Sequence, residues 1–157
     1  PPSPRSSAPP RCLLPAALIA PCVVPVVVCL TIAVGEGMGP GAALRAAAEQ
    51  ATGGRPSLVA AGVLFLLPVL LLLLGLRLGR RFDSDGEQLP ALGWAGLAAV
   101  LAVQVWANAS FWRLYLPDRT SPGFPHGLEL VIAPLFFAPA VVAVTAVVGF
   151  LMLRTGK

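Results

Sequence analysis

The sequence predicts an all-α protein, a bundle of four transmembrane helices with both termini in the cytoplasm. Two observations predict the spans. Charged residues make up 11% of the 157 residues and apolar residues 57%, with a mean hydropathy of +0.83, whereas a soluble domain is about one quarter charged. Four segments also carry no charged side chain: residues 12–35, 56–76, 88–112 and 130–153. At about 1.5 Å per helical residue, each can cross a hydrocarbon layer of about 30 Å.

The placement of the arginines predicts the direction of the spans. One side carries seven basic residues: Arg5, Arg11, Arg77, Arg80, Arg81, Arg154 and Lys157. On the other side, four arginines are balanced by four acids: Arg45, Arg55, Arg113 and Arg119 against Glu36, Glu49, Asp118 and Glu129. Because basic loops stay in the cytoplasm, the termini and loop 77–89 are predicted inside, and segments 36–55 and 113–129 outside. The net charge of +4 is thus attributed to topology, and no nucleic-acid partner is predicted.

The charge pattern also divides the chain. Residues 1–11 are rich in Pro, Ser and Arg and are predicted to be a disordered tail. Residues 12–153 form one membrane domain, with spans at about residues 12–34, 57–76, 90–108 and 130–153, and residues 154–157 are a C-terminal tail. The first span has an alternative interpretation as a cleaved signal, because residues 33–35 resemble a small-residue cleavage site. Its 24 uncharged residues exceed the usual h-region of about 7 to 15 and favour a transmembrane helix.

Prolines inside the spans predict kinks and close packing. A proline in a helix removes a backbone donor and leaves the carbonyl four residues earlier without its partner. Because lipid offers no hydrogen bonds, these carbonyls need partners from neighbouring helices. The spans are therefore expected to pack as a bundle. The prolines in question are Pro15, Pro21, Pro25, Pro68, Pro134 and Pro139.

Two further elements are predicted along the chain. The alanine-rich stretch 41–51 in the first outer segment, followed by two glycines, predicts a short surface helix. In the third span, Gln104 and Asn108 are four residues apart and share a helix face, so they are predicted to make intramembrane hydrogen bonds to a neighbour. Aromatic side chains around them are predicted to anchor the span at the membrane interfaces. These are Trp94, Trp106, Trp112 and Tyr115.

The outer segment 111–129 gathers the candidate catalytic residues His126, Glu129, Asp118 and Arg119. His126 and Glu129 are three residues apart where the fourth helix begins, a spacing that suits an acid and a base or two metal ligands. The competing interpretation is structural: Pro125 starts the helix and Glu129 complements its dipole. Two ligands do not make a metal site, so no metal and no cofactor is predicted.

The function predicted is that of a non-catalytic multi-pass membrane protein, a small subunit or an assembly or scaffold component of a larger membrane complex. The alternatives are a small transporter or channel, although the spans lack the ionisable residues that mark ion paths, and a membrane enzyme with its site on the outer loop 111–129. The expected partners are the lipid bilayer and either other membrane proteins or further copies of the chain. High Ala, Gly, Pro, Arg and Leu usage with one lysine indicates a GC-rich genome, and hence a bacterial inner membrane.

Overall fold

The computed structural model describes residues 12–52, 57–79, 88–118 and 127–155. The predicted N-terminal tail, residues 1–11, lies outside the described residues, as do residues 53–56, 80–87, 119–126 and 156–157. Every regular element in the described part is helical, which confirms the predicted all-α fold. In chain order the elements are α1 (Leu13–Gly35), α2 (Pro40–Thr52), α3 (Leu58–Gly79), α4 (Gln88–Asp118), α5 (Glu129–Ile132), the π-helical turn η1 (Ala133–Phe137) and α6 (Ala138–Thr155).

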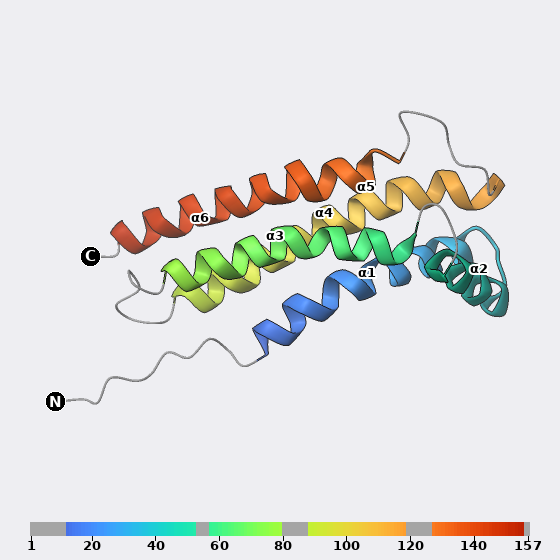
Figure 1. The fold of residues 1–157 in the computed structure, drawn as a ribbon, viewed down its shortest axis with the longest axis horizontal. Coiled ribbons are helices and arrows are strands. Elements are labelled where there is room, and N and C mark those ends of the chain that lie inside the picture. The colour runs from blue at the N-terminus through green and yellow to red at the C-terminus, as the bar shows by residue number, and fades with distance from the viewer. Residues whose placement is uncertain (1–11, 53–56, 80–87, 119–126, 156–157) are drawn as a thin grey trace.

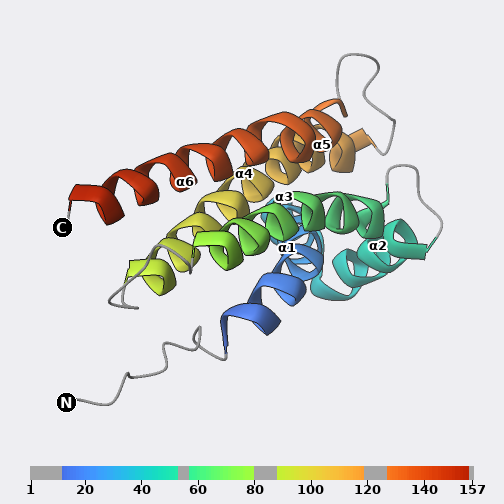
Figure 2. The same ribbon diagram turned by 60° about the vertical axis from the view of Figure 1, so that its left-hand side comes forward.

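Four helical segments of the described chain are long and apolar enough to cross a membrane: Leu13–Gly35, Leu58–Gly79, Gln88–Leu116 and Glu129–Met152. The fourth runs without a break through α5, η1 and α6. One end of the bundle holds the first turns of α1 and α4 and the last turns of α3 and α6 (Figure 1). We call this the Arg77 end, after the arginine in the last turn of α3. The short helix α2 lies at the opposite end, the α2 end (Figures 1 and 2).

The two central helices of the bundle are α3 and α4. Each packs against the other and against both α1 and α6, whereas α1 and α6 make no contact with each other in the described residues. An apolar helix face in a membrane needs no cover from protein, because lipid tails are as apolar as the side chains. Two of the four spans are therefore covered mostly on one side only.

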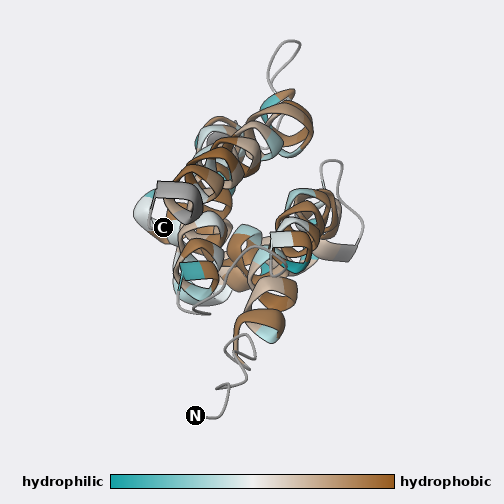
Figure 3. Ribbon diagram, turned by 90° about the vertical axis from the view of Figure 1, so that its left-hand side faces the viewer, coloured by the Kyte–Doolittle hydropathy of each residue, from teal (hydrophilic) through white to brown (hydrophobic). Residues whose placement is uncertain are grey.

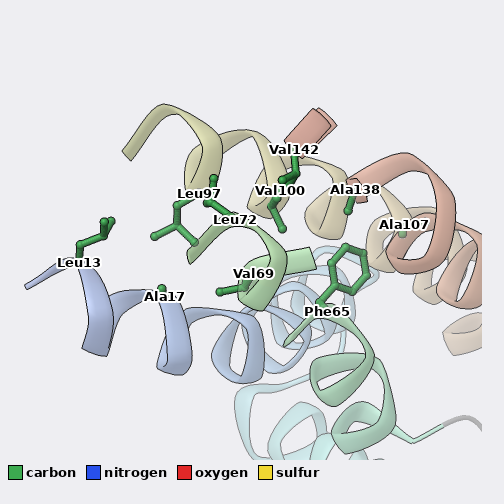
Figure 4. Close-up of a cluster of buried hydrophobic side chains, with 11 residues drawn as sticks. Leu13, Ala17, Phe65, Val69, Leu72, Leu97, Val100, Ala107, Ala138 and Val142 are labelled. Atoms are coloured by element: carbon green, nitrogen blue, oxygen red, sulfur yellow. The ribbon is translucent and has the colours of Figure 1, made fainter. Parts of the chain in front are cut away.

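Small side chains let the helices approach closely in two buried clusters. The cluster toward the Arg77 end centres on Phe65 and Val69 of α3 and Val100 of α4, with Ala17 of α1 and Ala138 of α6 at its edges (Figure 4). The second cluster lies toward the α2 end and is built around the aromatic side chains of α4. In hydrocarbon, van der Waals packing of this kind is the main attraction between helices.

Apolar side chains also lie on the outside of the bundle. Figure 3 shows hydrophobic residues along the long helices. Large apolar side chains are more than half exposed on every span, for example Leu14 on α1, Val63 on α3, Trp106 on α4 and Val147 on α6. A protein in water rarely exposes continuous apolar patches of more than a few hundred Å². Hydrocarbon is the solvent that matches this surface.

The helix predicted in the first outer segment is present as α2 and is tied to the bundle through its alanines. Ala43, Ala46 and Ala47 are buried, because their small side chains let α2 lie close to α1 and α3. Arg45 and Glu49 face away and are exposed. The segment thus covers one end of the bundle.

Two prolines lie at the π-helical turn in the fourth span. Pro134 lies in the first positions of η1 and Pro139 follows its end. Neither residue has an N–H, so the helical hydrogen-bond ladder loses two donors within this stretch. The wider turn is closed by the N–H of Ala138, which donates to the carbonyl of Ala133. A single turn of this type within an α-helix is where the ladder changes register.

Candidate functional site

A column of polar and aromatic side chains runs along one face of α4. Gln104, Asn108 and Trp112 follow one another at intervals of four residues, and Tyr115 continues the column toward the α2 end. The first three side chains have no exposed surface, and Tyr115 is 8% exposed. Residues three or four apart lie above one another on a helix, so the spacing alone brings the four together. We call this set the α4 column.

Gln104 joins α4 to α1 at the prolines of α1. Its side-chain Nε2 donates a 2.6 Å hydrogen bond to the carbonyl oxygen of Pro21. In an unbroken helix that carbonyl would accept from the residue four positions later, but this position is Pro25, which has no N–H. The glutamine therefore supplies the donor that the proline removes.

The same point of α1 is in close contact with α3. A Cβ added at Gly62 would lie 3.1 Å from both the Pro21 carbonyl oxygen and the Cα of Cys22. These are backbone atoms of the neighbouring helix, which cannot rotate away as a side chain can. Gly62 therefore sets how near α1 and α3 come, and three helices meet at the Pro21 carbonyl.

The next two members of the α4 column bind each other. The Nδ2 of Asn108 donates to the backbone carbonyl of Gln104 at 2.9 Å, and the Nε1 of Trp112 donates to the Oδ1 of Asn108 at 3.3 Å. Both hydrogen bonds stay within α4. Asn108 is thus satisfied inside its own helix, and Gln104 is the residue of the pair that reaches another helix.

Three aromatic rings of α4 pack together at the α2 end. Phe111 stacks on Tyr115 with centroids 5.5 Å apart, and Trp112 meets both rings edge to face at 5.0 and 5.6 Å. The hydroxyl of Tyr115 accepts a 3.1 Å hydrogen bond from Nε2 of Gln50 on α2. This bond attaches α2 to α4.

Two amide oxygens of this region are buried without a hydrogen-bond partner among the described residues, Oε1 of Gln104 and Oε1 of Gln50. Leaving a buried acceptor without a donor costs about 1–3 kcal/mol. Because the column consists of amides, an indole and a phenol, it can donate and accept hydrogen bonds. These groups suit helix-to-helix attachment better than proton transfer near neutral pH.

The candidate catalytic residues of the outer segment are only partly described. His126 and Arg119 lie outside the described residues. Asp118 is the last residue of α4, which continues well beyond the predicted end of the third span at residue 108, and its side chain is not described. Glu129 begins α5, and its carboxylate accepts a 2.6 Å hydrogen bond from the backbone N–H of Gly127, a residue with φ of +93°. The structure thus does not test whether the four residues meet.

The four predicted interface anchors differ in their surroundings. Trp94 and Trp106 are 42% and 52% exposed, so their rings face the surroundings of the bundle. Trp112 and Tyr115 are instead covered by protein, because they belong to a buried cluster with residues of α1, α2, α3 and α5. Burial under these helices could not be anticipated from spacing along a single helix.

Sequence reasoning missed two members of the site. Gln50 shows no signal for its contact with Tyr115, since the two residues are 65 positions apart. Gly62 does carry a signal, because an isolated glycine within a helical pattern often has a packing reason. In the described part of the chain no group of three His, Cys, Asp or Glu side chains is arranged to hold a metal ion.

A shallow apolar groove lies between α4 and α6, with a volume of about 850 Å³. Three alanines contribute to its lining: Ala99 and Ala102 from α4 and Ala140 from α6. At one end the rings of Trp106 and Phe137 meet edge to face with centroids 5.9 Å apart. We call this feature the α4–α6 groove.

Comparison with known proteins gives no relative: no protein-family model, curated protein or solved structure matches the chain. The class of protein therefore rests on its own fold and surface. Four apolar helices in a bundle with an apolar exterior define a multi-pass α-helical membrane protein.

Proposed function

We propose that this protein is a non-catalytic component of a larger membrane complex, a small subunit or an assembly factor that holds a transmembrane helix of a partner in the α4–α6 groove. The observation that carries the proposal is the composition of that groove. Small residues on an exposed helix surface let a second helix approach closely, and they are enriched where transmembrane helices associate. Ala102 and Ala140 line the groove and are exposed.

The roles of the polar side chains support the same proposal. Gln104 joins α4 to α1 by a hydrogen bond, and Asn108 and Trp112 form hydrogen bonds within α4. Thr145, which also lines the groove, donates its hydroxyl to the carbonyl of Val141 in its own helix. The α4–α6 groove is apolar, and a buried hydrogen bond holds α4 against α1 behind it. This combination suits a protein that offers a rigid docking surface.

A photo-crosslinking amino acid placed in the groove tests the proposal in native membranes. With the crosslinker at Ala102, we expect a discrete adduct with one membrane protein, identified by mass spectrometry. At Ala98, which is also exposed on α4 but does not line the groove, we expect only lipid adducts. Ala140→Leu, which fills the groove, should remove the protein adduct.

The outcomes separate the alternatives. An adduct between two copies of the chain would identify a homo-oligomer. The subunit proposal would be contradicted if both positions gave only lipid adducts and the protein were monodisperse and without partners after mild extraction. Loss of a transport or catalytic activity in His126→Ala, with normal membrane insertion, would instead support a site on the outer loop 111–129.

We further propose that the Arg77 end faces the cytoplasm of a bacterial cell and that the α2 end faces outward. The excess of basic residues in the segments that join the Arg77 end supports this orientation. Single cysteines at Ser84 and Ser121, in a chain whose three native cysteines are replaced, test it. A membrane-impermeant reagent should label intact cells or spheroplasts at residue 121 only, and labelling of both positions from one side would contradict the orientation.

A further inference from the structure

The buried side chains of the fourth span form two groups, one up to the first residues of the π-helical turn η1 and one beyond its end. Both groups face the same central helices, because α5 and α6 each pack against α3 and α4. The first group consists of Leu130, Ala133 and Pro134, and the second of Ala138, Val142 and Gly149.

A regular α-helix would not place the two groups on one face. Successive residues of an α-helix are about 100° apart around its axis. Leu130 and Gly149 are 19 positions apart, which corresponds to about five full turns and a further 100°. In a regular helix the second group would therefore be turned by about 100° relative to the first.

The π-helical turn removes this mismatch. Its hydrogen bond runs from the N–H of Ala138 to the carbonyl of Ala133, five residues earlier, whereas an α-helical bond reaches back four residues. The turn thus contains one residue more than an α-helical turn, and the helix beyond it is turned back by about 100°. The two buried groups then lie on one face.

The sizes of the side chains show what depends on this register. Ala138 has no exposed surface, and a Cβ added at Gly149 would lie 2.6 Å from Cδ1 of Leu92 on α4. Without the extra residue, each place in α6 would be taken by the preceding residue of the chain. Phe137 would then replace Ala138, and Val148 would replace Gly149 against Leu92. Both replacements are larger than the residues that fit there.

We propose that η1 is a register device of the fourth span: it holds one surplus residue and thereby turns the small residues of α6 toward α4. The same register places the ring of Phe137 against Trp106 and brings Ala140 into the lining of the α4–α6 groove. The turn thus decides which side chains of α6 a docking partner meets. That consequence rests on the proposed function, whereas the register itself concerns one chain alone.

Deletion of Leu135 tests the device, because it removes one exposed residue from η1. If the turn holds a surplus residue, the shortened turn becomes α-helical and α6 keeps its register. If the span were a regular helix, the same deletion would turn α6 by about 100° and bring Phe150 to the place of Gly149.

A disulfide between α4 and α6 distinguishes the two results. Leu92→Cys is combined with Gly149→Cys or with Phe150→Cys, in a chain whose three native cysteines are replaced. We expect the disulfide at position 149 before and after deletion of Leu135, with yields within about twofold, and at least about fivefold less at position 150. Transfer of the disulfide from position 149 to position 150 in the deletion variant would overturn the proposal.

The matched control is deletion of Ala98, an exposed residue of α4, which is α-helical from Gln88 to Asp118. This deletion turns the two parts of α4 against each other by about 100° and should abolish the disulfide at position 149 or the fold itself. Equal disulfide yields after the two deletions would overturn the proposal.

Deletion of Phe136, which is also exposed in η1, provides a second test of the same residue count. It should likewise preserve the disulfide at position 149. If neither deletion in η1 gave a folded protein, the turn would hold no surplus residue and the proposal would be wrong. These disulfides form within one chain, so the result does not depend on whether crosslinking at Ala102 finds a partner.

Discussion

The side-chain amide of Gln104 lies 2.6 Å from the carbonyl oxygen of Pro21 and binds α4 to α1 where α1 lacks a donor of its own. Pro25 removes a donor and Gln104 replaces it, so two residues 79 positions apart are energetically linked. In lipid no water can take the place of the glutamine. The bond therefore fixes the register of α4 against α1.

This linkage predicts a coupling between position 104 and position 25. Pro25→Ala restores an N–H that can bond to the Pro21 carbonyl within α1. Gln104→Leu should therefore be less destabilising in the Pro25→Ala background than in the unaltered chain, by about 1–2 kcal/mol. The difference between the two costs measures the bond, and it is obtained from unfolding titrations with sodium dodecyl sulfate followed by circular dichroism.

Thr145→Val provides the control for this cycle, because its hydroxyl bonds within α6, which does not touch α1. Its cost should be the same with or without Pro25→Ala, to within about 0.5 kcal/mol. Additive behaviour of Gln104→Leu and Pro25→Ala would show that the glutamine does not replace the missing donor.

Close approach of α1 and α3 predicts opposite outcomes for two glycines of the same helix. Gly62→Ala forces a methyl group against the backbone of α1 and should destabilise the bundle by about 1–2 kcal/mol. Gly75→Ala meets no atom and should be neutral or stabilising by up to ~1 kcal/mol, through the higher helix propensity of alanine. The same detergent titration compares them. Equal stability of the two variants would contradict the proximity of α1 and α3 at Gly62.

Attachment of α2 should depend on the hydrogen bond from Gln50 to Tyr115. Tyr115→Phe keeps the ring against Phe111 and removes only the acceptor. We expect the backbone amides of α2 to exchange with solvent deuterium about fivefold faster, as the loss of one hydrogen bond of about 1 kcal/mol implies. Exchange in α3 should not change. Gln50→Ala should give the same increase, and combining the two changes should add nothing further.

The exposure of the three tryptophans predicts how each responds to lipid. In single-tryptophan variants reconstituted without partners, Trp94 and Trp106 should be quenched strongly by brominated phospholipids, since their rings face outward. Trp112 has no exposed surface and should be quenched weakly. Fluorescence titration with the brominated lipid measures the contrast. Strong quenching of Trp112 would show that the neighbouring helices do not cover its ring.

Much of the fold follows from local properties of the chain. Uncharged runs of sufficient length predict the four spans, and the glycine pair after residue 51 predicts where α2 ends, since both signals act within a few residues. Gln104 could be recognised as a polar residue on a helix face. Its partner could not, because any of several carbonyls freed by prolines would have satisfied it equally well.

The candidate site could likewise be predicted from the sequence only in part. Spacing along α4 places Gln104, Asn108 and Trp112 on one face, as the helix period requires. It does not say that Tyr115 meets Gln50, because that contact depends on how α2 folds back over the bundle. For the same reason, the burial of Trp112 depends on a neighbouring helix.

Composition and the order of the charges alone determine that this chain suits hydrocarbon. Backbone buried in lipid must form its hydrogen bonds within the protein, so uncharged segments of this length form helices. Only the tertiary structure decides which helices touch, since lipid is as apolar as the helix faces and the hydrophobic effect does not select among them. That choice is made by local shape and by directional bonds: Gly62 lets α3 approach α1, and Gln104 bonds to the carbonyl of Pro21.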